Sequence, residues 1–207
     1  MNRPSITGVI LAGGLNTRFH GRTKAFIDID GKMIIDRLMD VYAKLFEDII
    51  IVSNNPLRYL DWDAQIVTDV LPTRSALTGI HTGLFYAHTD YAFIAACDIP
   101  FLKASVVALI LDSVRPDIDA VMPETQRGFE PLCALYATRL ADAAAQHVQQ
   151  GDFKIMRAFR KRRIRTVSEK RLRSVDPELM SFFNVNTPED LAGAERYCRR
   201  AAAAPED

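Results

Sequence analysis

Two glycines and two spaced cations near the start of the chain are residue types that bind a polyphosphate. Gly13 and Gly14 end an apolar run at residues 8–12, and Arg18 and Lys24 follow. Glycine can take φ > 0 and approach a ligand closely, and the peptide N–H groups exposed by such a turn form an anion nest. Arginine adds a planar fork of donors and lysine a compact point charge. We therefore predict a buried strand followed by a phosphate-binding loop.

The glycine spacing differs from that of two widespread nucleotide-binding loops. The next glycine after Gly14 is Gly21, so the G-x-G-x-x-G spacing of dinucleotide folds is absent, as is a G-x-x-x-x-G-K-[ST] run. An ordinary strand-to-helix turn with surface Arg and Lys has the same local pattern. The loop alone therefore does not decide the function.

Asp98 has the chemistry and the setting of a metal ligand. It follows an apolar run at residues 91–97 and precedes Ile99 and the stiff Pro100. Two like charges about 4 Å apart repel by roughly 4 kcal/mol at an effective dielectric of about 20, so a bare aspartate opposes a triphosphate. A hard divalent cation between them reverses the sign, which predicts Mg²⁺ at Asp98. The alternative is that Asp98 caps a helix beginning near Lys103 or bonds its own turn.

The elements that position these residues alternate between strand and helix patterns. Short apolar runs predict strands at residues 48–53, 65–68 and 91–97. Apolar residues at helical spacing predict helices at residues 33–46 and 78–88. This alternation predicts an α/β fold with a parallel, doubly wound sheet. Such sheets bind ligands outside the carboxyl ends of their strands, where Asn54 and Asp69 follow the second and third strands.

The composition favours one domain without a global charge. The chain has 207 residues, 48% of them hydrophobic, and Lys plus Arg equal Asp plus Glu at 26 each. We expect a folded domain over residues 1–200 and a flexible tail over 201–207. A neutral chain has no field that attracts nucleic acid or an anionic membrane, so neither is expected as a partner.

Cysteine usage and the N-terminal sequence favour a cytoplasmic protein. Cys97, Cys133 and Cys198 form no C-x-x-C pair, which argues against a zinc site or a disulfide framework. The N-terminal residues lack the pattern of a secretory signal, and no apolar run approaches membrane-spanning length.

Taken in order, these motifs resemble the molybdenum cofactor guanylyltransferase (MobA-like) family of nucleotidyltransferases over nearly the whole chain. Besides the positions already named, the resemblance includes CDIPF at 97–101, EPLCALY at 130–136 and FNVNTPEDL at 183–191. The glycine loop is shared with sugar and cytidylyl transferases, whereas LAGG together with NVNTPE is most similar to the guanylyl branch.

The resemblance implies a single-domain, Rossmann-like three-layer sandwich with a mostly parallel central sheet, of the nucleotide-diphospho-sugar transferase type. It implies a Mg²⁺-dependent enzyme in which the terminal phosphate of the molybdenum-bound pterin attacks the α-phosphate of GTP and releases pyrophosphate. The implied partners are GTP and molybdopterin or the molybdenum cofactor. A molybdoenzyme acceptor or another protein of cofactor biosynthesis is a further candidate partner.

The resemblance also implies roles for individual residues. Those contacting the nucleotide are Leu11, Ala12, Gly13, Gly14, Lys24, Asn54, Asp69 and Asp98. Arg18 and Lys24 would bind the phosphates, and Asp98 would hold Mg²⁺, which makes these three the catalytic set. Asn184 and Asn186 form a second polar pair near the cleft, assigned to the acceptor substrate.

Two departures from the family pattern leave other functions open. Phe19 and His20 replace a methionine and a glycine, and residues 72–77 replace a glycine-proline-leucine run near the nucleoside. One alternative is a cytidylyl or sugar-phosphate nucleotidyltransferase, although sugar enzymes usually follow the loop lysine with proline and Ala25 stands here. The other is a non-catalytic protein that escorts the cofactor.

Two features lie in the C-terminal third. Residues 154–173 are strongly basic, which predicts one of two structures. One is a surface that binds an anion. The other is a short helix with a solvated basic face and an inner face formed by Phe153, Met156 and Phe159, followed by an edge strand at 164–167. Thr187, with Asp190 three residues later, predicts a capped final helix.

Overall fold

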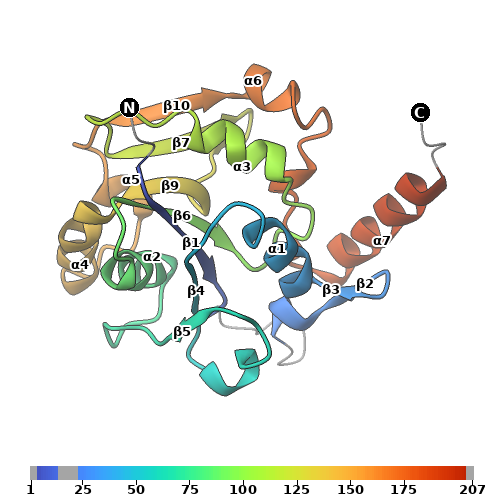
Figure 1. Cartoon of the computed structure of the whole chain (residues 1–207), viewed down its shortest axis with the longest axis horizontal. Coiled ribbons are helices and arrows are strands. Elements are labelled where there is room, and N and C mark those ends of the chain that lie inside the picture. Colours follow the sequence, from blue (N-terminus) through green and yellow to red (C-terminus); the bar gives the residue numbers. More distant parts are fainter. Residues whose placement is uncertain (1–3, 14–22, 204–207) are drawn as a thin grey trace.

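A mixed sheet forms the centre of the protein. The computed structural model describes residues 4–13 and 23–203. The strands of the sheet are β1 (Ile6–Leu11), β4 (Ile49–Val52), β5 (Gln65–Val67), β6 (Tyr91–Ala96), β7 (Ala120–Thr125), β8 (Gly128–Phe129), β9 (Cys133–Ala137) and β10 (Ile164–Ser168). They are ordered β10-β7-β9-β6-β1-β4-β5, with β8 paired to β7 (Figure 1).

Most strand pairs of the main sheet are parallel, and the pairs formed by β9 and by the short β8 are antiparallel. Strands β5, β4, β1 and β6 run parallel, as do β7 and β10, while β9 is antiparallel to both of its neighbours, β6 and β7. Two reversals across β9 give β7 and β10 the same direction as β6. The carboxyl ends of all six therefore face one edge of the sheet.

The central strands are buried on both faces, as their apolar sequences predict. Along β1, Ile10 packs into one hydrophobic core and Val9 into another, because successive side chains point to opposite faces. On strand β6, Phe93 and Ile94 divide in the same way. This alternation creates two cores, one on each side of the sheet.

Helices cover both faces and complete three layers. One core contains side chains of α1 (Ile34–Tyr42), α3 (Ala104–Leu111), α6 (Glu169–Arg173) and α7 (Pro188–Ala203). The other contains side chains of α2 (Ala76–Tyr86), α4 (Ala141–Gln149) and α5 (Ile155–Ala158), and Figure 1 shows α2 and α4 together on one side of the sheet.

A small hairpin lies apart from the main sheet. Strands β2 (Asp28–Ile29) and β3 (Lys32–Met33) are joined by Asp30 and Gly31, whose φ angles are 56° and 77°. Positive φ at both central residues is the geometry that Asp-Gly turns favour. The hairpin contacts α7, and both lie at the right of Figure 1.

Two local predictions need correction. The second helix begins at Ala76 rather than Thr78, because the Ser75 hydroxyl caps the N–H of Thr78 at 3.0 Å. In the basic segment Phe159 is fully buried, but the Phe153 side chain is 42% exposed and does not belong to an inner face. The edge strand predicted there is confirmed as β10.

None of the described helices has the length and apolar character needed to cross a bilayer. Helix α7 runs to Ala203, and residues 204–207 of the expected tail lie outside the described part of the chain.

Candidate active site

Four strand ends are aligned at the edge where the ligand was predicted. The register pairs Leu11 with Val52 on one side and with Ala96 on the other, and Val52 pairs with Val67. The chain segments that follow these strands therefore start side by side, with the Ala12 N–H donating to the Val52 carbonyl at 2.8 Å.

Asn54 and Asp69 meet across two neighbouring strand ends. The Asn54 side-chain amide donates to a carboxylate oxygen of Asp69 at 2.7 Å, and both residues are partly buried. Gly13 lies beside them, because a Cβ added to it would lie 3.6 Å from Asn54 Nδ2. Gly13 does not have a left-handed φ. A glycine here is therefore explained by the missing side chain, which would let the backbone approach a ligand closely.

Lys24 joins two segments that are remote in sequence. It begins the 3₁₀ turn η1 (Lys24–Phe26), and its Nζ contacts Asp98 Oδ2 at 3.1 Å and Asn186 Oδ1 at 2.5 Å. The Lys24 and Asp98 side chains are each 21% exposed, so the pair is shielded but still open to a ligand. A cation, a carboxylate and an amide thus converge at one point.

Asn186 is held in place by the start of α7. The Asp190 carboxylate accepts the N–H groups of Asn186 and Thr187, each at 2.9 Å, and the Thr187 hydroxyl accepts the Asp190 N–H at 3.2 Å. These bonds, first that from Asn186, hold the pKa of Asp190 below its usual value. The capping box predicted from the sequence is confirmed and orients this asparagine.

A backbone bond places the asparagine segment against the metal-ligand candidate. The Val185 N–H donates to the Asp98 carbonyl at 2.8 Å. Asn184, on the same segment, is partly buried. Among the predicted site residues that the structure describes, the hydrogen bonds between side chains form two groups, one with Asn54 and Asp69 and one with Lys24, Asp98 and Asn186.

The oxygen chemistry of Asp98 fits a hard cation that arrives with a nucleotide. Magnesium commonly takes one or two carboxylates together with substrate phosphates. Across the described residues there is no group of three or more His, Cys, Asp or Glu side chains that could hold a metal. The helix-capping alternative for Asp98 is not observed, since Lys103 occupies the N-cap position of α3.

Cys97, directly before Asp98, is not suited to be a nucleophile. It is fully packed, and burial, reinforced by the Asp98 charge, raises the pKa of its thiol to about 12. At neutral pH the thiol stays protonated, and the thiolate is the reactive form. Cys97 is therefore not a candidate catalytic residue.

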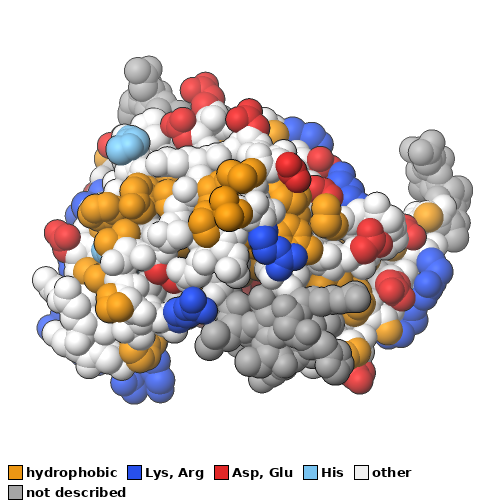
Figure 2. Space-filling model, turned by 90° about the horizontal axis from the view of Figure 1, so that it is seen from below, with side chains coloured by type: hydrophobic (Ala, Val, Ile, Leu, Met, Phe, Trp, Pro, Cys, Tyr) orange, Lys and Arg blue, Asp and Glu red, His pale blue; other side chains and the backbone are white. Residues whose placement is uncertain are grey.

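Strand β1 runs downward in Figure 1, and Figure 2 shows the molecule from below. A few Lys and Arg side chains lie near the middle of this face, and others lie at its margin together with most of the Asp and Glu side chains. The cations near the middle would suit an anionic ligand although the chain as a whole is neutral.

A family model described as MobA-like NTP transferase domain matches residues 8–167. The chain belongs to this family.

Relatives of the MobA-like family match almost end to end. A protein of Desulfosudis oleivorans named molybdenum cofactor guanylyltransferase is 48% identical, over 92% of this chain and 95% of its own length. A probable molybdenum cofactor guanylyltransferase of Natranaerobius thermophilus is 33% identical over 93% of this chain and 96% of its own.

A solved structure shares the fold. Molybdopterin-guanine dinucleotide biosynthesis protein A from Archaeoglobus fulgidus superposes with a TM-score of 0.82 at 29% identity, covering 94% of this chain and 99% of that one. The family and the fold class predicted from the sequence are both confirmed, and the chain is a MobA-like nucleotidyltransferase.

Gly14 and Arg18, together with Phe19 and His20, lie outside the described residues. Their predicted roles remain predictions.

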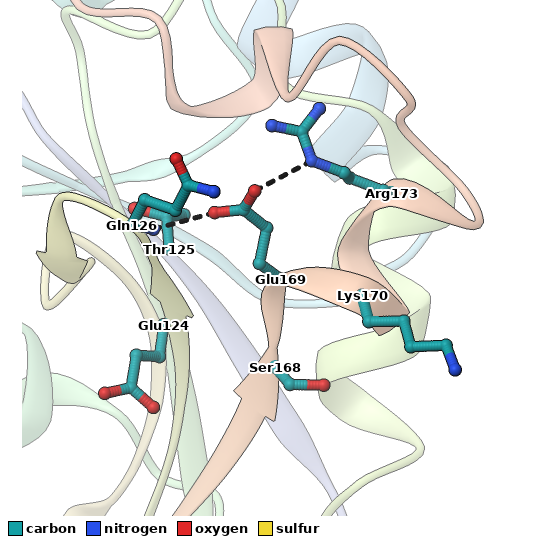
Figure 3. Close-up of a pocket in the computed structure, with 7 residues that line it drawn as sticks. All are labelled: Glu124, Thr125, Gln126, Ser168, Glu169, Lys170 and Arg173. Atoms are coloured by element: carbon teal, nitrogen blue, oxygen red, sulfur yellow. Dashed lines mark hydrogen bonds and ion pairs between the residues drawn. The ribbon is translucent and has the colours of Figure 1, made fainter.

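A hollow at the same edge lies away from these residues. It is formed by the β7–β8 turn and the start of α6, and Figure 3 shows Glu169 between Gln126 and Arg173. The Glu169 carboxylate accepts the Gln126 N–H at 2.7 Å and contacts Arg173 Nε at 2.8 Å. None of the predicted site residues that the structure describes lines this hollow.

Sequence reasoning missed the residues that hold the glycine loop from outside. Arg58 and Tyr59, in the 3₁₀ turn η2 (Pro56–Tyr59), bond to Thr23 and Ala12. No local pattern marks them, because their contacts depend on how β4 and β1 are placed side by side.

Proposed function

We propose that this chain transfers GMP from GTP to the terminal phosphate of molybdopterin in the molybdenum cofactor, releasing pyrophosphate. Membership of the MobA-like family and the names of its full-length relatives support this reaction. The observation that carries it is the contact of Lys24 with Asp98 and Asn186, which brings a phosphate-binding cation, a metal-ligand candidate and the acceptor segment together.

The nucleotide would occupy the side of the edge formed by β1, β4 and β5. Backbone groups of Leu11, Ala12 and Gly13 would contact it, while Asn54 and Asp69, already bonded to each other, would contact the nucleoside. Arg18 and Gly14 would complete the phosphate cradle. A pre-formed polar pair of this kind orients a ligand with little reorganisation.

Asp98 would hold Mg²⁺ together with the nucleotide. The bound metal would neutralise charge on the reacting phosphates and so favour their approach to an anionic acceptor. Lys24 has an ammonium with three donors, so it can bind phosphate oxygens in place of, or beside, its present oxygen partners.

The attacking group is itself an anionic phosphate, so the reaction needs no strong general base. What the chain must supply is alignment and charge compensation. Asn186, fixed by Asp190, and Asn184 on the same segment would orient the acceptor. A cytoplasmic location and transfer of the product to a molybdoenzyme or another protein of cofactor biosynthesis remain predictions.

Pyrophosphate release tests the proposal directly. Purified protein with Mg²⁺ and molybdenum cofactor is compared with GTP, CTP and ATP, each beside an Asp98→Asn variant. We expect acceptor-dependent release from GTP that the variant lacks. Release from CTP instead would replace the base assignment, and tight GTP binding without release from any nucleotide would favour a cofactor escort.

A further inference from the structure

Two consecutive residues hold the two described flanks of the glycine loop. The Tyr59 hydroxyl donates to the Ala12 carbonyl at 3.3 Å, before the loop, and the Arg58 guanidinium donates to the Thr23 hydroxyl at 2.8 Å, after it. Both belong to η2, which begins two residues after Asn54. The turn thus connects the nucleoside side of the site with the segment that carries Lys24.

Arg58 contacts that segment on both sides of Lys24. Besides its bond to Thr23, its guanidinium lies 4.3 Å from the centre of the Phe26 ring. Phe26 ends the same 3₁₀ turn that Lys24 begins. A planar guanidinium can donate in its plane and stack on an aromatic face at once, which an ammonium cannot do in the same way.

The fold does not need Arg58 to bury this region. Phe26 packs against Tyr59 and Trp62, with ring centres 5.0 and 5.8 Å apart, and Tyr59 is fully buried. Arg58 itself is exposed, whereas Thr23 is only 6% exposed. Removing the guanidinium therefore leaves the aromatic packing in place and releases chiefly the orientation of residues 23–26.

We propose that Arg58 is a positioning residue of the active site, which fixes the Thr23–Phe26 turn so that the ammonium of Lys24 stays directed at Asp98 and Asn186. The inference rests on the proposed function, in which Lys24 binds the reacting phosphates. Arg58 acts through Lys24 and does not contact the reacting atoms.

Steady-state kinetics with GTP test the role of Arg58. Arg58→Ala should lower kcat/KM about tenfold, Arg58→Lys about threefold, and Thr23→Val, which removes the hydroxyl acceptor, about as much as Arg58→Ala. Arg200→Ala is the matched control, because Arg200 is also exposed and lies 5.5 Å from a ring centre, that of Tyr197, on α7. It should change kcat/KM by less than twofold.

Double variants separate positioning from direct binding. Thr23→Val combined with Arg58→Ala should be no worse than either alone, and Arg58→Ala should have no further effect in a Lys24→Ala background. An additional tenfold loss in the Lys24→Ala background would show that Arg58 acts independently, and would overturn the proposal. The proposal would also be overturned if Arg58→Ala left the kinetics unchanged, with or without a lower Tm.

Hydrogen exchange keeps the test independent of the reaction. The amides of Phe26 and Ile27 donate to the carbonyls of Thr23 and Lys24, each at 3.0 Å, and close the turn. Arg58→Ala should speed their exchange at least tenfold, and Arg200→Ala should not; equal exchange in both variants would overturn the proposal. If the wild type transfers no nucleotide, the proposed function fails, and exchange alone decides whether Arg58 holds this turn.

Discussion

Two groups of charged side chains lie at the same edge of the sheet, and they are built differently. Lys24 reaches Asp98 and Asn186, which are 74 and 162 positions away in sequence. Glu169 pairs with Arg173 one helical turn away, and the Arg173 side chain is 47% exposed. The first group exists only when three distant segments are assembled, whereas the second forms wherever Glu and Arg are four residues apart on a helix.

The difference indicates where function lies. Bringing remote charges together costs chain entropy and desolvation, so such a contact is retained where charge must be held in place. An exposed ion pair within one helical turn contributes little to stability and carries little information about function. The first group should therefore control the reaction and the second should not.

The largest expected effect comes from Lys24→Ala. Loss of the ammonium should lower kcat by two to three powers of ten, equivalent to roughly 3–4 kcal/mol of activation free energy. Lys170→Ala, at the hollow beside Glu169, is the matched control and should leave kcat within about twofold. Equal kcat values for Lys24→Ala and wild type would remove Lys24 from the mechanism.

Asp176→Ala should have the next largest effect, on folding stability. Asp176 is fully buried, pairs with Lys103 Nζ at 2.8 Å and accepts the Ser181 N–H at 2.8 Å. These contacts fix the chain before Asn184 against the start of α3. Because Lys103 is 37% exposed and water can solvate it in the variant, we expect a loss of about 2–3 kcal/mol in the free energy of unfolding.

Urea unfolding measures this loss, with Glu178→Ala as the control. Glu178 is exposed and pairs with Arg200 at the surface, so its removal should change the free energy of unfolding by less than about 0.5 kcal/mol. Similar losses in both variants would mean that the buried Asp176 pair contributes no more to the free energy of unfolding than the exposed Glu178 pair.

The Asp176 pair also predicts acid sensitivity. Burial alone would raise the pKa of Asp176, but hydrogen bonds from Lys103 and Ser181 outweigh burial and lower it. A carboxyl whose pKa is lower in the folded chain stabilises the fold above its unfolded pKa of about 4, and this contribution is lost as pH falls through the folded pKa. Below about pH 4 the wild type should therefore lose stability more steeply than Asp176→Ala.

A smaller effect is expected at the nucleoside side. Asp69→Ala removes the carboxylate bonded to Asn54 and should raise KM for GTP about tenfold, or about 1.4 kcal/mol, with kcat within twofold, as expected for uniform binding. Asp61→Ala, an exposed aspartate between β4 and β5, is the control. A fall in kcat without a change in KM would instead assign Asp69 to the chemical step.

Local sequence patterns predicted much of the fold. Apolar runs gave the strands around β1, and Thr187 with Asp190 gave the start of α7, because these signals depend on neighbours along the chain. The antiparallel direction of β9 was not predicted. An apolar run is compatible with a parallel or an antiparallel strand, and the pairing of β9 with β6 and β7 is set by tertiary contacts.

The site was predicted as a set of residues but not as an arrangement. Lys24, Asp98 and Asn186 were each named, and the structure adds that they touch. Arg58 was missed because its partners, Thr23 and Phe26, are brought to it by the alignment of β4 with β1. Contacts of this kind have no periodicity in the sequence.

The smallest effect is expected from Glu169→Gln, and it tests the comparison most sharply. The hydrogen bond from Arg173, followed by that from the Gln126 N–H, lowers the pKa of Glu169, so this carboxylate is ionised at neutral pH and is already paired. Its replacement should leave kcat and KM for both substrates within about twofold. An acceptor titration at fixed GTP is the decisive measurement, because the hollow and Asp98 share one edge of the sheet. A tenfold rise in KM for the acceptor, with KM for GTP unchanged, would join the two charged groups into one cleft and assign the second to acceptor binding.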